Sequence, residues 1–195
     1  MKKYKWYIGF ILVTLLVSAC KKDDIDPTAE AWKQQNEQAL SDLARNPEFN
    51  ALKMQGGYNF NIYYRIIQQG EGKRIYYNSR AEVYYKGWFV VTNADKNIKE
   101  GDVFDHQVFD DGVTFKLAVS SQAMDANYVY STVIEGWGIA LQNMVEGDKW
   151  EIWIPYRLGY GEVDKTDNNG IVTIPAYSTL AFEIEVVKAI DPDEF

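Results

Sequence analysis

A strict alternation of apolar and polar residues near the C-terminus limits this chain to folds that contain a sheet. Over residues 179–186 the apolar side chains of Leu180, Phe182, Ile184 and Val186 alternate with polar or small ones. Successive side chains of a strand point to opposite faces of a sheet, so this pattern predicts a β-strand with one buried face. Because a strand needs hydrogen-bonded neighbours, other parts of the chain must supply the rest of the sheet.

Four further segments show weaker forms of the same alternation and are separated by turn-forming residues. They cover residues 58–67, 80–89, 113–117 and 150–154. Together with the C-terminal strand and one short helix they predict an α+β fold, in which an antiparallel twisted β-sheet wraps around the helix.

The helix is predicted within residues 133–144, where the period changes. Trp137, Ala140, Leu141 and Met144 follow one another at i, i+3, i+4 and i+7, which places them on one helical face. Trp137 is therefore expected in the first turn of a helix whose apolar side faces inward. The same spacing fits a helix that only packs in the core, so other segments must decide whether Trp137 has a further role.

The first 19 residues have the layout of a signal peptide. Lys2, Lys3 and Lys5 precede a run of 12 residues, 6–17, that is largely apolar and too short to span a bilayer as a helix. The run Val17-Ser18-Ala19-Cys20 resembles a bacterial lipobox, which implies cleavage before Cys20 and acylation of that residue. We therefore expect a protein tethered to a membrane of the cell envelope, with the outer membrane favoured, on its periplasmic side or at the cell surface.

Residues 20–57 are expected to form a tether that contains a helix, and residues 58–195 a single domain. Asp26 reads as an N-cap with Pro27 at the first helical position, and the helix is expected to extend to Arg45. Its apolar stripe is thin, which favours a spacer that docks only partly on the domain.

The charge of the chain argues against nucleic acid as a partner. The net charge is −8, and removal of the signal peptide leaves 17 basic against 28 acidic side chains. An acidic surface repels phosphate backbones. We expect a monomer.

Hydrolytic, metal and phosphate chemistries are poorly supported. His106 is the only histidine and no G-x-S-x-G elbow accompanies it, while Cys20 is the only cysteine. Residues 164–170 resemble a calcium loop but lack its first carboxylate and its final Glu. Residues 70–73 lack the spacing of a phosphate loop and are read as a turn. The sequence predicts no metal and no cofactor.

Seven segments, in the same order, resemble the FKBP-type peptidyl-prolyl cis-trans isomerases. They are residues 83–88, 104–105, 115–117, 133–144, 154–161, 174–175 and 180–182. The resemblance implies an isomerase that acts on proline-containing polypeptides and assists the folding of extracytoplasmic proteins.

The resemblance also implies roles for individual residues. Catalytic roles fall on Tyr85, Phe104, Asp105, Trp137, Tyr160 and Phe182. Substrate-binding roles fall on Val113, Val133, Ile134 and Ile174. The rings would cradle the proline, while the Ile134 N–H and the Tyr160 hydroxyl would anchor carbonyl groups of the substrate.

The chain departs from the family pattern in ways that leave an alternative open. After Phe104-Asp105 the family usually has an Arg that pairs with the Asp, whereas residues 106–111 of this chain contain none, so Asp105 is expected to lack a cationic partner. Val113 stands where many members have a further ring. The loops over residues 90–103 and 119–132 are longer than usual. The alternative is a non-catalytic FKBP-fold lipoprotein that binds a protein or peptide.

Overall fold

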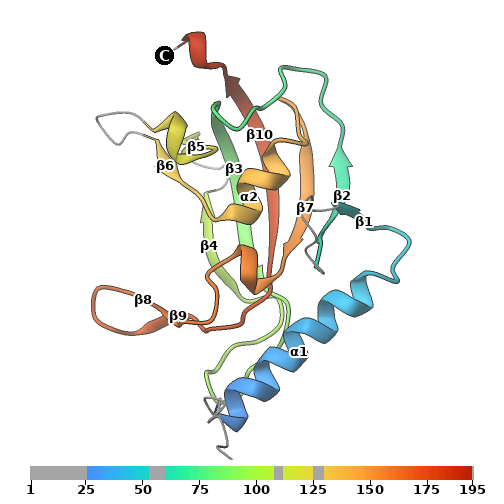
Figure 1. The fold of residues 1–195 in the computed structure, drawn as a ribbon, viewed down its shortest axis with the longest axis vertical. Coiled ribbons are helices and arrows are strands. Elements are labelled where there is room, and N and C mark those ends of the chain that lie inside the picture. Colours follow the sequence, from blue (N-terminus) through green and yellow to red (C-terminus); the bar gives the residue numbers. More distant parts are fainter. Residues whose placement is uncertain (1–25, 53–59, 108–111, 125–129, 195) are drawn as a thin grey trace, which may run out of the picture.

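The computed structural model describes residues 26–52, 60–107, 112–124 and 130–194 of the chain (Figure 1). The predicted signal peptide, Cys20 and the start of the predicted first strand at Tyr58 lie outside these ranges. Within them, no helix has both the length and the apolar character needed to cross a membrane.

Eight strands of the described residues form one sheet in the order β1-β2-β7-β10-β3-β5-β6, with β4 beside β3. The strands are β1 (Asn50–Leu52), β2 (Ile62–Gln68), β3 (Arg80–Phe89), β4 (Val103–Gln107), β5 (Phe115–Ala118), β6 (Ser131–Thr132), β7 (Lys149–Ile154) and β10 (Leu180–Ile190). All neighbours pair antiparallel except β5 and β6, which are parallel. A mostly antiparallel sheet with a short helix confirms the predicted α+β fold.

The C-terminal strand β10 lies at the centre of this sheet, between β3 and β7. It continues four residues past the predicted end at Val186. The pairing with β3 shifts register between Val186 and Lys188, and after the shift Ala189 and Ile190 are buried again. Because a bulge interrupts the two-residue period, the alternation in the sequence could not be followed beyond it.

The sequence predicted only five strands, because the shorter strands show little alternation of apolar and polar residues. β4 exposes most of its residues, and Val103 is 48 % exposed. A second, two-stranded sheet pairs β8 (Lys165–Thr166) with β9 (Val172–Ile174). Such strands lack a buried face of their own, so their residues need not alternate.

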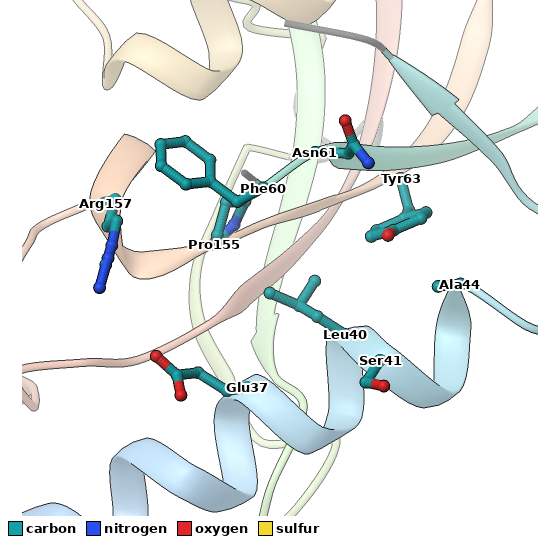
Figure 2. Close-up of a pocket in the computed structure, with 9 residues that line it drawn as sticks. All are labelled: Glu37, Leu40, Ser41, Ala44, Phe60, Asn61, Tyr63, Pro155 and Arg157. Carbon is teal, nitrogen blue, oxygen red and sulfur yellow. The ribbon is translucent and has the colours of Figure 1, made fainter. Parts of the chain in front are cut away.

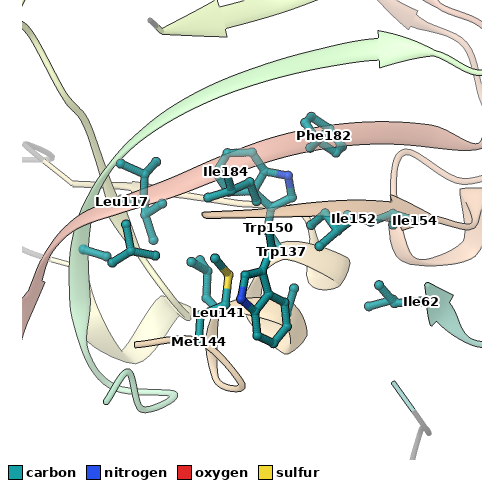
Figure 3. Close-up of a cluster of buried hydrophobic side chains, with 14 of the residues drawn as sticks. Ile62, Leu117, Trp137, Leu141, Met144, Trp150, Ile152, Ile154, Phe182 and Ile184 are labelled. Carbon is teal, nitrogen blue, oxygen red and sulfur yellow. The ribbon is translucent and has the colours of Figure 1, made fainter. Parts of the chain in front are cut away.

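The short helix α2 (Glu135–Leu141) lies across one face of the sheet (Figure 1). Trp137, Leu141 and Met144 pack with sheet residues in a buried cluster, and Met144 is buried although the helix ends three residues earlier (Figure 3). A Cβ on Gly136 would lie only 2.4 Å from Cγ2 of Ile154, so glycine lets α2 approach β7 closely. The predicted inward face of the helix is confirmed.

The helix α1 (Pro27–Leu43) begins where the sequence predicts. The Asp26 carboxylate accepts a hydrogen bond of 2.8 Å from the Thr28 N–H, which satisfies one of the free N–H groups of the first turn. The helix ends two residues before Arg45. In the ribbon view α1 lies at the opposite end of the molecule from the C-terminus (Figure 1).

α1 packs on the domain more fully than its thin apolar stripe suggests. Asn36 is fully buried; its Nδ2 donates to the Trp32 carbonyl at 2.8 Å, and its Oδ1 accepts from the Thr179 N–H at 2.7 Å. Trp32 forms a second buried cluster with Tyr156 and Tyr177. A polar residue thus joins the helix to the segment that leads into β10.

A cavity of about 430 Å³ remains between α1 and the domain (Figure 2). Leu40 and Glu37 of α1 face Phe60, Pro155 and Arg157 across it. None of the residues predicted to act on a substrate lines this cavity.

Candidate active site

A different cavity, of about 370 Å³, opens beside the first turn of α2. It is lined by Tyr85, Phe104, Asp105, Phe115, Thr132, Val133, Ile134, Trp137, Tyr160, Lys165 and Phe182. All six residues predicted to be catalytic therefore meet in one place, together with two of the four predicted to bind substrate.

The pairing of β3 with β10 brings two of the rings together. Phe182 lies opposite Gly87, and Ile184 lies opposite Tyr85, so Tyr85 and Phe182 project from the same face of the sheet. A Cβ on Gly87 would lie 2.7 Å from Cζ of Phe104 and from Cε1 of Phe182. Glycine at this position leaves the space that both rings occupy.

Trp137 forms the floor of the cavity. The residue is 3 % exposed. The centre of its ring lies 5.1 Å from that of Tyr85 and 5.3 Å from that of Phe182, and each of these rings is nearly perpendicular to the Trp137 ring. Phe104 meets Phe182 at 5.6 Å in the same edge-to-face way. This geometry is a favourable one for aromatic pairs, and it holds the rings as the walls of a largely apolar box.

One carboxylate faces this box. The Tyr85 hydroxyl donates a hydrogen bond to the Asp105 carboxylate. Burial, and then this bond and the negative charge of Asp105, raise the pKa of Tyr85 far above its usual range. Tyr85 therefore remains neutral at physiological pH, and its hydroxyl keeps a proton that it can donate to Asp105.

Tyr160 enters the cavity from a tight turn after the 3₁₀ helix η3 (Tyr156–Leu158). Gly161 follows it with a φ of 77°, a value that side chains other than glycine rarely adopt. The Gly161 N–H donates to the Tyr156 carbonyl, and its own carbonyl accepts from the Tyr177 N–H, each at 2.9 Å. These bonds fix the backbone that carries the Tyr160 ring.

Two residues predicted to bind substrate do not line the cavity. Val113 is 58 % exposed and precedes β5, whereas Phe115, two residues later, supplies a ring to the box. Ile174 is buried in the main core. Its partner across the β8–β9 hairpin is Lys165, which does reach the cavity.

Thr132 and Lys165 were missed by sequence reasoning, as was the place of Phe115 in the pocket. Thr132 immediately precedes the recognised Val133-Ile134 pair, and Phe115 shares its strand face with Val113, so both positions could have been found. No pattern marks Lys165, because only the folding of a short exposed hairpin brings it to the pocket.

The described part of the chain offers no group of three or more His, Cys, Asp and Glu residues arranged to hold a metal ion. The chemistry available to the cavity is that of its rings, one carboxylate, hydroxyl groups and one ammonium group.

An antiparallel sheet wrapped around a short helix, with an aromatic box at the first turn of that helix, defines the class of FKBP-like domains. Comparison with solved structures agrees. A crystal structure of a peptidyl-prolyl cis-trans isomerase from Pseudomonas syringae pv. tomato superimposes with a TM-score of 0.61 and 25% identity, over 86% of this chain and 99% of that one.

The sequence comparisons narrow the class to a family. The family model of the FKBP-type peptidyl-prolyl cis-trans isomerases matches residues 72–187. The chain is 31% identical to the FKBP-type 22 kDa peptidyl-prolyl cis-trans isomerase of Escherichia coli, over 86% of this chain and 69% of that protein. It is also 31% identical to the macrophage infectivity potentiator of Trypanosoma cruzi, over 73% of this chain and 58% of that protein.

The chain belongs to the FKBP-type peptidyl-prolyl cis-trans isomerase family and is an enzyme of this type. The predicted family and activity are confirmed. Proline-containing polypeptides are the substrates that this family membership implies.

Proposed function

We propose that this enzyme accelerates X-Pro isomerisation in extracytoplasmic client proteins while a lipid on Cys20 tethers it to the membrane. The observation that carries the catalytic part is the meeting of five rings, a carboxylate and the Tyr160 hydroxyl around one small cavity. The sequence of residues 1–20 supports the membrane part.

The reaction suits such a cavity. Rotation about an X-Pro amide breaks its resonance and faces a barrier of about 18–20 kcal/mol, so the uncatalysed change takes tens of seconds or longer. No bond to the enzyme forms, and no strong nucleophile is required. In the twisted amide, charge shifts back from the carbonyl, so an apolar surround favours the transition state over the planar amide.

The aromatic residues would hold the proline itself. Tyr85, Phe104 and Phe182 would enclose the pyrrolidine ring, with Trp137 beneath it. Their edge-to-face contacts fix the walls before substrate arrives, so little ordering is needed on binding.

Polar groups at the edge of the box would hold the chain on either side of the proline. The Ile134 carbonyl accepts the N–H groups of Trp137 and Gly138 and so begins α2, whereas its own N–H precedes the helix and would donate to a substrate carbonyl. The Tyr160 hydroxyl would donate to a second carbonyl. Asp105, held by Tyr85, would orient the pocket around the twisted carbonyl.

The test is an exchange measurement by NMR on an Ala-Leu-Pro-Phe peptide with the full chain in mild detergent. The wild type is expected to increase the cis-trans exchange rate in proportion to enzyme concentration. Replacing two walls of the box, in Tyr85→Ala/Phe182→Ala, is expected to remove most of this increase. Equal rates with and without the wild-type enzyme would refute the proposal.

A further inference from the structure

Lys165 is the only basic side chain that lines the catalytic cavity among the described residues. Its backbone is fixed by the small hairpin of β8 and β9. Lys165 pairs with Ile174, whose side chain is buried in the main core, and its carbonyl accepts a hydrogen bond of 3.1 Å from the Thr173 hydroxyl. The fold therefore fixes the backbone position of Lys165, although its side chain is exposed.

The ammonium group lies over the ring of Tyr160, with Nζ 4.2 Å from the ring centre. This distance is typical of a cation–π contact, and Lys165 itself lines the cavity. Lys165 and Tyr160 therefore contact each other in the wall of the same cavity.

The nearest acidic residue in sequence does not neutralise Lys165. The Asp164 carboxylate accepts the Ala176 N–H at 2.7 Å and lies 3.8 Å from Lys96. None of the ion pairs within the described part of the chain includes Lys165. Asp105, in the same cavity, is engaged by the Tyr85 hydroxyl.

We propose that Lys165 forms a subsite for a carboxylate, so that the enzyme prefers prolines with a neighbouring Asp or Glu in the client chain. The proposal rests on the isomerase function proposed above and names the kind of client that it favours. The protein is otherwise acidic and would repel an anionic segment over most of its surface. The positive charge of Lys165 beside the pocket would attract a carboxylate there, against the repulsion by the rest of the surface.

The experiment compares kcat/KM for matched peptides that differ only in charge. Ala-Glu-Pro-Phe is paired with Ala-Gln-Pro-Phe, and Ala-Ala-Pro-Glu with Ala-Ala-Pro-Gln, so that both sides of the proline are tested. We expect the wild type to favour the Glu peptide of at least one pair by about two- to fivefold, the range of an exposed ion pair. Raising the salt concentration should reduce this ratio.

Three variants of the full chain locate the effect. Lys165→Gln is expected to bring the Glu/Gln ratio close to one, and Lys165→Arg to retain it because the charge remains. Lys116→Gln is the matched control, since Lys116 is an exposed lysine of β5 outside the cavity. That control should keep the wild-type ratio.

Two results would overturn the subsite and leave the isomerase function standing. One is a wild-type ratio of one for both pairs while the neutral peptides are accelerated. The other is an equal loss for Glu and Gln peptides in Lys165→Gln, which would show that Lys165 acts through Tyr160 or Asp105. If no peptide is accelerated, the isomerase function fails and the subsite fails with it.

Discussion

Trp137 serves the core and the catalytic cavity with the same side chain. It belongs to the buried cluster of the main core, and it also lines the aromatic box. The helical spacing of the sequence indicated the first role, and only the resemblance to the family indicated the second. A residue with both roles cannot be changed at the pocket without an effect on the fold.

Trp137→Ala is therefore expected to reduce both stability and activity. Removing a large buried aromatic side chain commonly lowers the free energy of unfolding by about 3–5 kcal/mol, since the surroundings collapse only in part. Urea denaturation followed by circular dichroism measures this change. A variant as stable as the parent would show that Trp137 is not a buried floor.

One buried tyrosine, Tyr156, and one partly buried tyrosine, Tyr85, predict a loss of stability in alkali. Burial is the main cause that raises the pKa of Tyr85 and that raises the pKa of Tyr156 to about 12. In the unfolded chain both titrate near pH 10. The folded state favours their neutral form, so their contribution is complete below about pH 10 and is lost as the pH rises above it.

Thermal unfolding between pH 8 and pH 12 checks this expectation. The melting temperature of the wild type should fall above about pH 10, and Tyr85→Phe should fall less steeply because phenylalanine has no proton to lose. A slope that is identical in both proteins would mean that Tyr85 does not contribute.

The residues that sequence reasoning placed in the pocket are mostly those that lie on long, regular elements or next to them. Tyr85 and Phe182 lie on strands whose residues alternate between the two faces of the sheet. The face to which each of these side chains projects could therefore be predicted from the sequence. Val113 was misplaced because β5 begins two residues later than its alternation suggested. Lys165 could not be predicted, because a strand of two residues has no alternation that shows on which face its side chains lie.

Among the elements, length and burial decided what could be predicted. The bounds expected for β3 agree with the structure, since its ten residues form a long strand between turn-forming segments. β4 carries Phe104 and Asp105, yet it was not recognised as a strand because it is short and largely exposed. The family resemblance located its residues where the alternation could not.

The docking of α1 depends on Asn36, and Asn36→Ala tests it. The substitution leaves the buried Thr179 N–H without its acceptor, which commonly costs about 1–3 kcal/mol. Thr179 directly precedes β10, so a lower kcat/KM is also expected as the Phe182 strand loosens. Chemical denaturation and the peptide exchange assay measure the two effects.

Gln35→Ala is the matched control for this prediction. Gln35 lies beside Asn36 in α1 but is exposed, so its loss should change neither quantity appreciably. If both variants behave like the wild type, the buried amide of Asn36 does not hold the helix on the domain.

At the scale of the whole molecule, the class of fold followed from the sequence but the order of the strands did not. Alternation shows that a segment is a strand and which side is buried, and it says nothing about its neighbours. The central position of β10 between β3 and β7 depends on the pairing of distant segments. Only the resemblance to a known family could anticipate it.

The membrane attachment proposed for the whole molecule rests on Cys20, which lies outside the described residues. Cys20→Ser is expected to move the protein from the membrane fraction to the soluble fraction, because the acyl chains provide the anchoring energy. Cell fractionation with an antibody measures the distribution. Retention of the serine variant in the membrane fraction would contradict the proposal.

The close packing of α1 on the domain determines how freely an anchored enzyme could move. Six residues, 21–26, separate Cys20 from the first residue of the helix. Even fully extended, the seven steps from Cys20 to Pro27 span about 25 Å. With the lipid on Cys20, the end of the folded body that carries α1 stays within that distance of the bilayer. Clients would then meet the enzyme only in a thin layer above the membrane, so the proteins that pass through this layer would be the ones it serves.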